Sequence, residues 1–162
     1  MTEREDQRLE QTWETPPLDE IPKISRMHVA AMEQSDDDAV WVPEGQHLVL
    51  LRVIGRRSGN EQKVALPYWR DAEGRRIVVA SFAGAPRHPD WFLNLEDRTA
   101  NPEVLVRAQG RHQFWSRPEI LDGAEYRRTW DALTADRAWY RDYQARTDRR
   151  IPLVRLPETR PA

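Results

Sequence analysis

The chain has 162 residues, a formal net charge of −2 and no cysteine. This length suits one domain, and the near balance of charge argues against a general nucleic-acid-binding surface, which needs an excess of basic residues. Without cysteine there is no disulfide, zinc–thiolate site or thiol nucleophile. No apolar run approaches the roughly 20 residues that cross a bilayer, and the charged start, MTEREDQRLEQ, is unlike a secretory signal. We therefore expect a cytoplasmic protein without stable membrane insertion.

The first residues of the chain are charge-rich and end on two prolines. This composition predicts a flexible N-terminal arm over residues 1–20, followed by a single domain over residues 21–162.

A helix is expected over residues 21–34, because apolar residues recur there at spacings of three and four. The face consists of Ile24, Met27, His28 and Ala31. An amphipathic helix of this kind usually packs on the body of a domain, but it could also act as a lid that contributes to a substrate pocket.

The middle of the chain alternates apolar runs with turn residues. Strands are expected at residues 47–54, 63–69, 76–82, 104–108, 112–117 and 152–156. The first of them, HLVLLRVI, is almost wholly aliphatic, as in a strand buried on both faces. The segments DAEG and QGR have turn composition, and each predicts a hairpin.

Helices are expected between these hairpins. One covers residues 89–96, where a proline opens the first turn and an aspartate follows at the positive end of the dipole. Another runs from Asp122 to about residue 137, with Asp122 as N-cap and Glu125 completing a capping box, and a third covers residues 139–146. Because most connections are too short for parallel crossovers, we expect an α+β fold built on an antiparallel barrel.

The turn within VIGRRSGNEQKVALPYW, residues 53–69, is the most informative local feature. Two glycines let the backbone turn tightly and approach a ligand. Between them, Arg56, Arg57 and Ser58 offer two planar cations and a hydroxyl, which is chemistry that holds a phosphate or a carboxylate. The same residues could instead form only a solvated basic tip, since charge at loop tips is ordinary.

Four segments, taken together and in order, resemble the deazaflavin-dependent nitroreductase family. They are residues 53–69, residues 78–95 (VVASFAGAPRHPDWFLNL), residues 101–106 (NPEVLV) and residues 142–156 (DYQARTDRRIPLVRL). The resemblance covers about residues 46–156. It implies the split β-barrel fold shared with FMN-binding pyridoxamine-oxidase-like proteins. It also implies an oxidoreductase that transfers a hydride from reduced coenzyme F420 to a quinone, an enone-type C=C bond or a nitro compound.

The resemblance also implies a set of site residues. The cofactor-binding positions would be Arg56, Arg57, Ser58, Lys63, Phe82, Gly84, Ala85, Pro86, Arg87 and Trp91. The basic turn would hold the phosphate and the acidic tail, and the Gly-Ala-Pro segment would lie against the deazaflavin ring. Tyr140 and Tyr143, which share a helix face, would line the substrate side and supply a proton. Trp91 and the tyrosines could equally be core residues.

Three positions depart from the family pattern. Gln62 stands where many members have arginine, Phe82 where many have lysine, and Arg137 replaces an aromatic residue of the substrate wall. Arg87, five residues after Phe82, could supply the missing charge. FMN, or no cofactor, is therefore an alternative to F420. Alternative functions are a non-redox step in specialised metabolism and the binding of a flavin-like or haem-like ligand.

No metal site is expected, because the four histidines lack the spacing of metal ligands. The expected partner is a small-molecule substrate. Split barrels often pair, and members of this family also occur as monomers, so the chain is expected to be a monomer or a homodimer.

Overall fold

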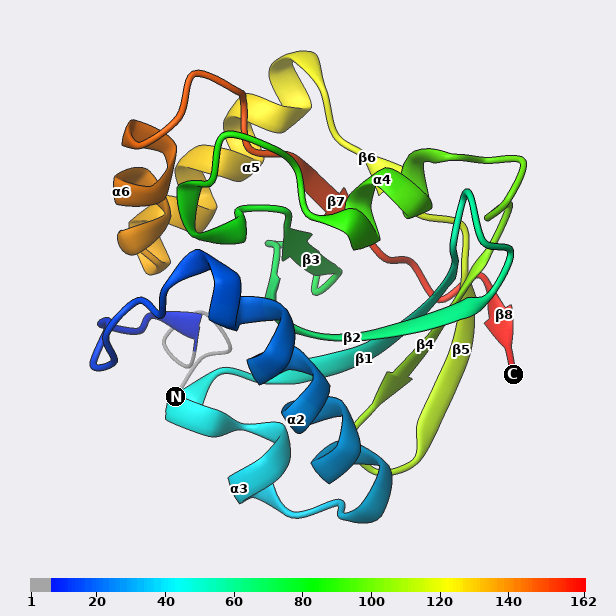
Figure 1. The fold of residues 1–162 in the computed structure, drawn as a ribbon. Helices are drawn as coiled ribbons and strands as arrows, with labels where there is room; N and C mark the ends of the chain where they lie inside the picture. Colours follow the sequence, from blue (N-terminus) through cyan, green and yellow to red (C-terminus); the bar gives the residue numbers. More distant parts are fainter. Residues whose placement is uncertain (1–6) are drawn as a thin grey trace.

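The computed structural model describes residues 7–162 (Figure 1). These residues form one curved antiparallel sheet of eight strands, in the order β6-β7-β3-β2-β1-β4-β5-β8. The strands are β1 Leu48–Ile54, β2 Glu61–Arg70, β3 Arg76–Val79, β4 Val104–Ala108, β5 His112–Ser116, β6 Glu119–Ile120, β7 Leu153–Arg155 and β8 Arg160–Pro161. The expected α+β class and antiparallel architecture are confirmed.

Helices lie on both halves of this sheet. They are η1 Leu18–Glu20, α2 Ile21–Gln34, α3 Asp38–Trp41, η2 Pro43–Gly45, η3 Phe82–Gly84, α4 Asp90–Glu96, α5 Gly123–Asp136 and α6 Trp139–Ala145. In Figure 1, α2 and α3 lie beside β1 and β2, whereas α5 and α6 lie beside β3 and β7. None of the helices within residues 7–162 is long and apolar enough to cross a membrane.

Strand β2 connects the two halves of the sheet. Its residues from Glu61 to Pro67 pair with β1, and those from Tyr68 to Arg70 pair with β3. Pro67 is the last residue of the β1 ladder, a position where the missing N–H disturbs a sheet least. Because β2 is longer than the expected strand at both ends, it carries side chains from the basic turn to the far half of the sheet.

Strand β3 ends earlier than expected. The apolar run RIVVASF predicts a strand to residue 82, but β3 stops at Val79. Phe82 and Ala83 then adopt left-handed conformations, with φ of 44° and 52°. The carbonyls of Ala80 and Ser81 accept hydrogen bonds from the Arg149 side chain, so a guanidinium from a distant segment takes the place of a strand partner.

Helix α2 has its expected bounds, but the expected apolar face was wrong. Met27 is 63% exposed, whereas Val29 and Met32 are buried. The buried face packs instead in a hydrophobic cluster with Trp41, Leu48 and Leu50. On the same side of the helix, Ser25 Oγ accepts a hydrogen bond from the backbone N of Ala65 on β2 (3.1 Å).

The expected capping box of α5 was also wrong. Asp122 is the N-cap residue, but its side chain makes no capping hydrogen bond. The carboxylate of Glu125 pairs instead with the guanidinium of Arg155 on β7, which also binds Glu119 (2.8 Å). A charged guanidinium is a stronger partner than a backbone N–H, and it lowers the pKa of Glu125.

Residues 7–20 of the expected arm lie against the body of the domain; the first six residues of the chain lie outside the described part. The backbone N of Leu9 donates to the carbonyl of Asp136 (3.0 Å). Trp13 packs edge-on against Trp139, with ring centroids 5.0 Å apart. The flexibility of the arm stays a prediction, while these contacts place its second part beside α6.

Candidate functional site

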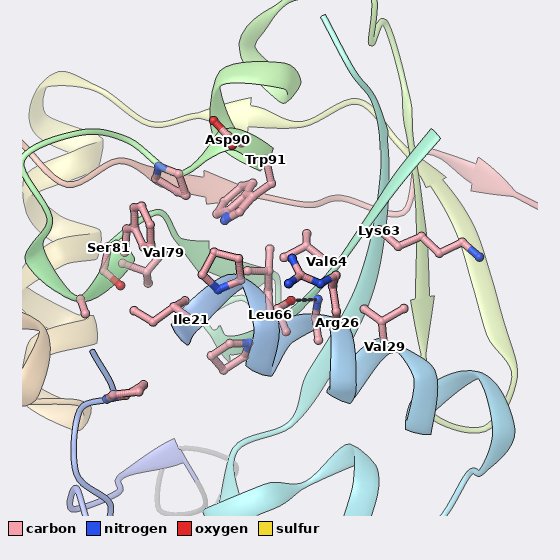
Figure 2. A pocket seen from close by; sticks show the side chains of 18 of the residues that line it. Ile21, Arg26, Val29, Lys63, Val64, Leu66, Val79, Ser81, Asp90 and Trp91 are labelled. Atoms are coloured by element: carbon pink, nitrogen blue, oxygen red, sulfur yellow. Dashed lines mark hydrogen bonds between the residues drawn. The ribbon is translucent and has the colours of Figure 1, made fainter. Parts of the chain in front are cut away.

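A cavity of about 730 Å³ lies between α2, β2, the loop after β3, α4 and α6. Figure 2 shows Ile21, Leu66, Val79 and Trp91 around it. Tyr140 and Tyr143 of α6 complete its far wall together with neighbouring aromatic residues. A large, mainly apolar cavity with a few polar groups is typical of a small-molecule site.

A second cavity of about 200 Å³ adjoins the first at the basic turn. It is lined by Gly55, Arg56, Arg57, Ser58, Gln62, Asp90 and Asn94. Gln62 and Asp90 line both cavities. The two together place an apolar chamber next to a basic end, which suits a ligand with one flat and one anionic part.

The basic end is held in place by helix α4. The Oδ1 atom of Asn94 accepts from Arg56 twice, from its backbone N (3.1 Å) and from Nη1 (2.8 Å). Asn94 Nδ2 donates to Gln62 Oε1 (3.2 Å). Arg56 is half-buried by these contacts, whereas Arg57 and Ser58 are exposed. Arg57 is therefore available to a ligand, and Arg56 has further donors beyond the one that Asn94 uses.

A second asparagine fixes the strand end that precedes the turn. Asn101 accepts from the backbone N of Ile54 (2.7 Å) and donates to the carbonyls of Ile54 and Asn94 (both 2.8 Å). Sequence analysis missed both asparagines as supports of the site. The available signal was a polar side chain within the apolar helix DWFLNLE, where a buried amide needs partners.

Lys63 and Arg87, both expected near the cofactor, each form an ion pair within the protein. Lys63 Nζ pairs with Glu33 of α2 (3.0 Å), and in Figure 2 its side chain extends away from the other labelled residues. Arg87 pairs with Asp90 (3.6 Å), and its guanidinium lies 5.2 Å from the ring centre of Phe82. Arg87 thus places a positive charge beside Phe82, the position where many family members have lysine.

Of the residues expected to bind the cofactor in the loop after β3, only some line the cavity. Phe82 and Arg87 belong to the lining. Gly84 and Ala85 are buried and Pro86 is exposed, and none of these three is among the lining residues that the structure describes. The loop residues that line the cavity are Ser81, Phe82 and Ala83 at its start and Arg87 near its end.

The aromatic residues serve as both core and cavity wall. Trp91 is 9% exposed and belongs to the main hydrophobic cluster, yet it lines the cavity. The hydroxyl of Tyr143 lies 3.1 Å from Thr15 Oγ1 in the N-terminal segment. Burial raises the pKa of Tyr140 to about 12, so its hydroxyl is a weaker acid than that of an exposed tyrosine.

One part of the cavity wall that sequence analysis missed comes from the start of the chain, and another comes from β2. The first part includes Trp13, Pro16, Pro22, Ser25 and Arg26. The charged and proline-rich composition around Trp13 and Pro16 predicts only an arm. For Pro22, Ser25 and Arg26, the possible role of their helix as a lid was the one indication of a place near a pocket. No group of side chains within residues 7–162 could hold a metal ion.

The sequence profile of the F420H(2)-dependent quinone reductase family matches residues 24–158. The chain belongs to this family. An F420H(2)-dependent quinone reductase of Mycobacterium tuberculosis (strain H37Rv) is 32% identical over 117 residues, which are 71% of this chain and 76% of that one.

Two solved structures are similar to this member of the F420H(2)-dependent quinone reductase family. An F420-H2 dependent reductase, FDR-A, has 32% identity and a TM-score of 0.56 over 68% of this chain and 93% of that one. A protein described as a domain-swapped dimer has 28% identity and a TM-score of 0.57 over 82% and 96%. The comparisons confirm the family resemblance, the split-barrel fold and an F420-dependent oxidoreductase.

The described residues fit coenzyme F420. Arg57 and the remaining donors of Arg56 meet the requirement for cations at the phosphate and acidic tail, while the adjoining chamber is apolar and aromatic, as a deazaflavin ring requires. Asp90 is the one carboxylate that lines both described cavities, and Arg87 pairs with it (3.6 Å). Both cavities are formed by this single chain.

Proposed function

We propose that this protein reduces a quinone with reduced F420 by hydride transfer. When bound, reduced F420 supplies the hydride. The observation that carries the proposal is that the apolar chamber adjoins the basic end, with Gln62 and Asp90 lining both. A flat, electron-poor acceptor has room in the part of the chamber formed by Trp13, Tyr140 and Tyr143.

The chain would act mainly by holding the two reactants. Arg56 and Arg57 bind the anionic end of the cofactor and fix how deep its ring enters the chamber. The apolar wall displaces water from the ring and the acceptor. The hydroxyl of Tyr140 can donate a hydrogen bond to an acceptor oxygen that gains negative charge. Burial raises the pKa of Tyr140 to about 12, so the hydroxyl would give up its proton less readily than that of an exposed tyrosine.

The hydroxyl of Tyr143 is expected to contribute to turnover. In Tyr143→Phe, kcat should fall roughly 100-fold while the dissociation constant for F420 stays unchanged, because general acid catalysis supplies roughly 100-fold or more where water cannot replace the donor. Steady-state kinetics and a fluorescence titration measure the two quantities. Thr15→Val is the matched control, since it removes the same hydrogen bond (3.1 Å) but keeps the tyrosine hydroxyl. Equal losses of kcat in both variants would assign Tyr143 to holding the N-terminal segment instead.

The direct test compares three acceptors under one set of conditions. Reduced F420 is mixed with the protein and with a naphthoquinone, a cyclic enone or a nitroaromatic compound, and the return of deazaflavin absorbance is followed. We expect kcat/KM for the quinone to exceed that for the other two by about ten-fold, equivalent to roughly 1.4 kcal/mol of transition-state binding. A larger kcat/KM for the nitro compound or the enone would overturn the choice of acceptor, and no oxidation with any of the three would overturn the reaction.

A further inference from the structure

Arg149, in the segment between α6 and β7, extends its guanidinium into the loop after β3. It makes four polar contacts there. Nε donates to the carbonyl of Ala85 (2.7 Å), Nη1 to that of Ala80 (3.1 Å), and Nη2 to that of Ser81 (2.7 Å), while Nη1 also lies 3.0 Å from His88 Nδ1. Because a guanidinium only donates, His88 Nδ1 is the acceptor in this pair.

The loop that Arg149 binds has a conformation that its sequence does not favour. Phe82 and Ala83 have φ of 44° and 52°, a region that costs about 1–3 kcal/mol for a residue other than glycine. Such a conformation persists only where surrounding contacts fix it. Arg149 supplies these contacts from one side, and Arg146 Nη1 adds a bond to the carbonyl of Ala83 (3.3 Å).

The opposite side of the same loop forms the cavity wall. Ser81, Phe82 and Ala83 all line the 730 Å³ cavity. Ser81 therefore faces the ligand space while its carbonyl binds Arg149. The loop is held between a guanidinium and the ligand space, so a change at Arg149 is transmitted to the lining residues.

We propose that Arg149 is a positioning residue that holds the loop of residues 80–88 in its ligand-binding conformation before F420 arrives. This inference rests on the proposed function of the same cavity. A protein whose competent conformation is only fractionally populated binds its ligand more weakly by that fraction. Arg149 thus raises the affinity for F420 through the loop, by removing the cost of ordering it on binding.

A direct attraction between Arg149 and the anionic cofactor is a different explanation, and the geometry disfavours it. Arg149 is not among the residues within 7–162 that line either cavity. Each nitrogen of its guanidinium group is already bonded to the loop. Burial of this group also lowers the pKa of Arg149, as expected for a cation that is partly removed from water.

The test separates positioning from charge with three variants. Arg149→Lys keeps the charge but loses the planar fork that reaches divergent carbonyls, and Arg149→Met loses both. Arg141→Met, at an exposed position of α6, controls for the loss of one positive charge. The dissociation constant for oxidised F420 is measured by deazaflavin fluorescence, on protein that circular dichroism shows to be folded.

We expect the dissociation constant to rise about ten-fold or more in both Arg149 variants, as it does when the competent fraction falls to about a tenth, and to change less than about two-fold in the control. Normal affinity in Arg149→Lys would overturn the proposal, because charge alone would then suffice. Normal affinity in Arg149→Met, even with a lower Tm, would reduce the role of Arg149 to fold stability.

Amide hydrogen exchange of the wild-type protein provides a second measurement that needs no variant. The backbone N of Gly84 and of Ala85 donate within the loop, to Ser81 (2.9 Å) and to Phe82 (3.0 Å). We expect both amides to be protected before F420 is added. Rapid exchange without F420, and protection only with it, would show that the loop is ordered by the ligand, and would refute the proposal while leaving the proposed function intact. Failure of the wild-type protein to bind F420 would refute the proposed function instead.

Discussion

Replacing Arg56 and Arg57 together by alanine is expected to raise the dissociation constant for F420 by roughly 100-fold or more. Hydrogen bonds to charged groups contribute about 1.5–3 kcal/mol each, and every 1.4 kcal/mol is about ten-fold in affinity. Both residues line the smaller cavity, where Arg57 is exposed and Arg56 is half-buried. The measurement is a titration of deazaflavin fluorescence.

The matched control for this pair is Arg127→Ala with Arg128→Ala. These two adjacent arginines are exposed on α5, outside both cavities, and their removal changes the net charge equally. The affinity of the wild-type protein should also fall as salt is added, because exposed charges are screened, and the salt dependence should be weaker in the Arg56 and Arg57 variant. Equal affinities in the variant and the control would refute an anion site at this turn.

Replacing Gly84 by alanine is expected to reduce the free energy of unfolding by about 2–5 kcal/mol. Its φ is +80°, and a Cβ atom there would lie 2.4 Å from the carbonyl oxygen of Tyr143 and 2.9 Å from Arg146 Cβ. The left-handed backbone costs an alanine about 1–2 kcal/mol, and the overlap adds about 1–3 kcal/mol, as overpacking usually does. Denaturant unfolding monitored by circular dichroism measures the loss.

Gly110→Ala separates these two contributions. Gly110 has φ of +83°, and a Cβ atom there would have no atom within 4 Å. This variant should therefore lose only the conformational part, about 1–2 kcal/mol. Equal losses of unfolding free energy at the two positions would mean that the backbone of α6 moves to make room for a Cβ atom at position 84 at little energetic cost.

The six expected strands and the two expected hairpins are present because their signals are local, whereas the two-residue strands β6 and β8 were missed. The aliphatic run of β1 and the apolar run after the basic turn form an antiparallel pair, with Leu48 opposite Pro67 and Ile54 opposite Glu61. The basic turn was also accessible, since residue types alone indicate its chemistry. These features depend on neighbours within about twenty positions of the chain, over which periodicity and turn composition are informative.

The features that sequence analysis missed depend on contacts between distant segments. After the end of β3, the exposed carbonyls bind Arg149, about seventy positions away, and the buried face of α2 packs against Trp41, Leu48 and Leu50. The packing of Trp13 on Trp139 is of the same kind. A single polar side chain that satisfies backbone groups elsewhere leaves no periodic trace, so hydrophobic patterns do not reveal it.

The N-terminal segment contributes Trp13 and Pro16 to the larger cavity, and neither residue lines the smaller one. Under the proposed function, retention of the coenzyme and selection of the oxidant would depend on separate segments of the chain. Mutations in the N-terminal segment would then change the range of compounds accepted without weakening retention of the reductant. For an engineer seeking a new reducible compound, that stretch is the place to diversify first.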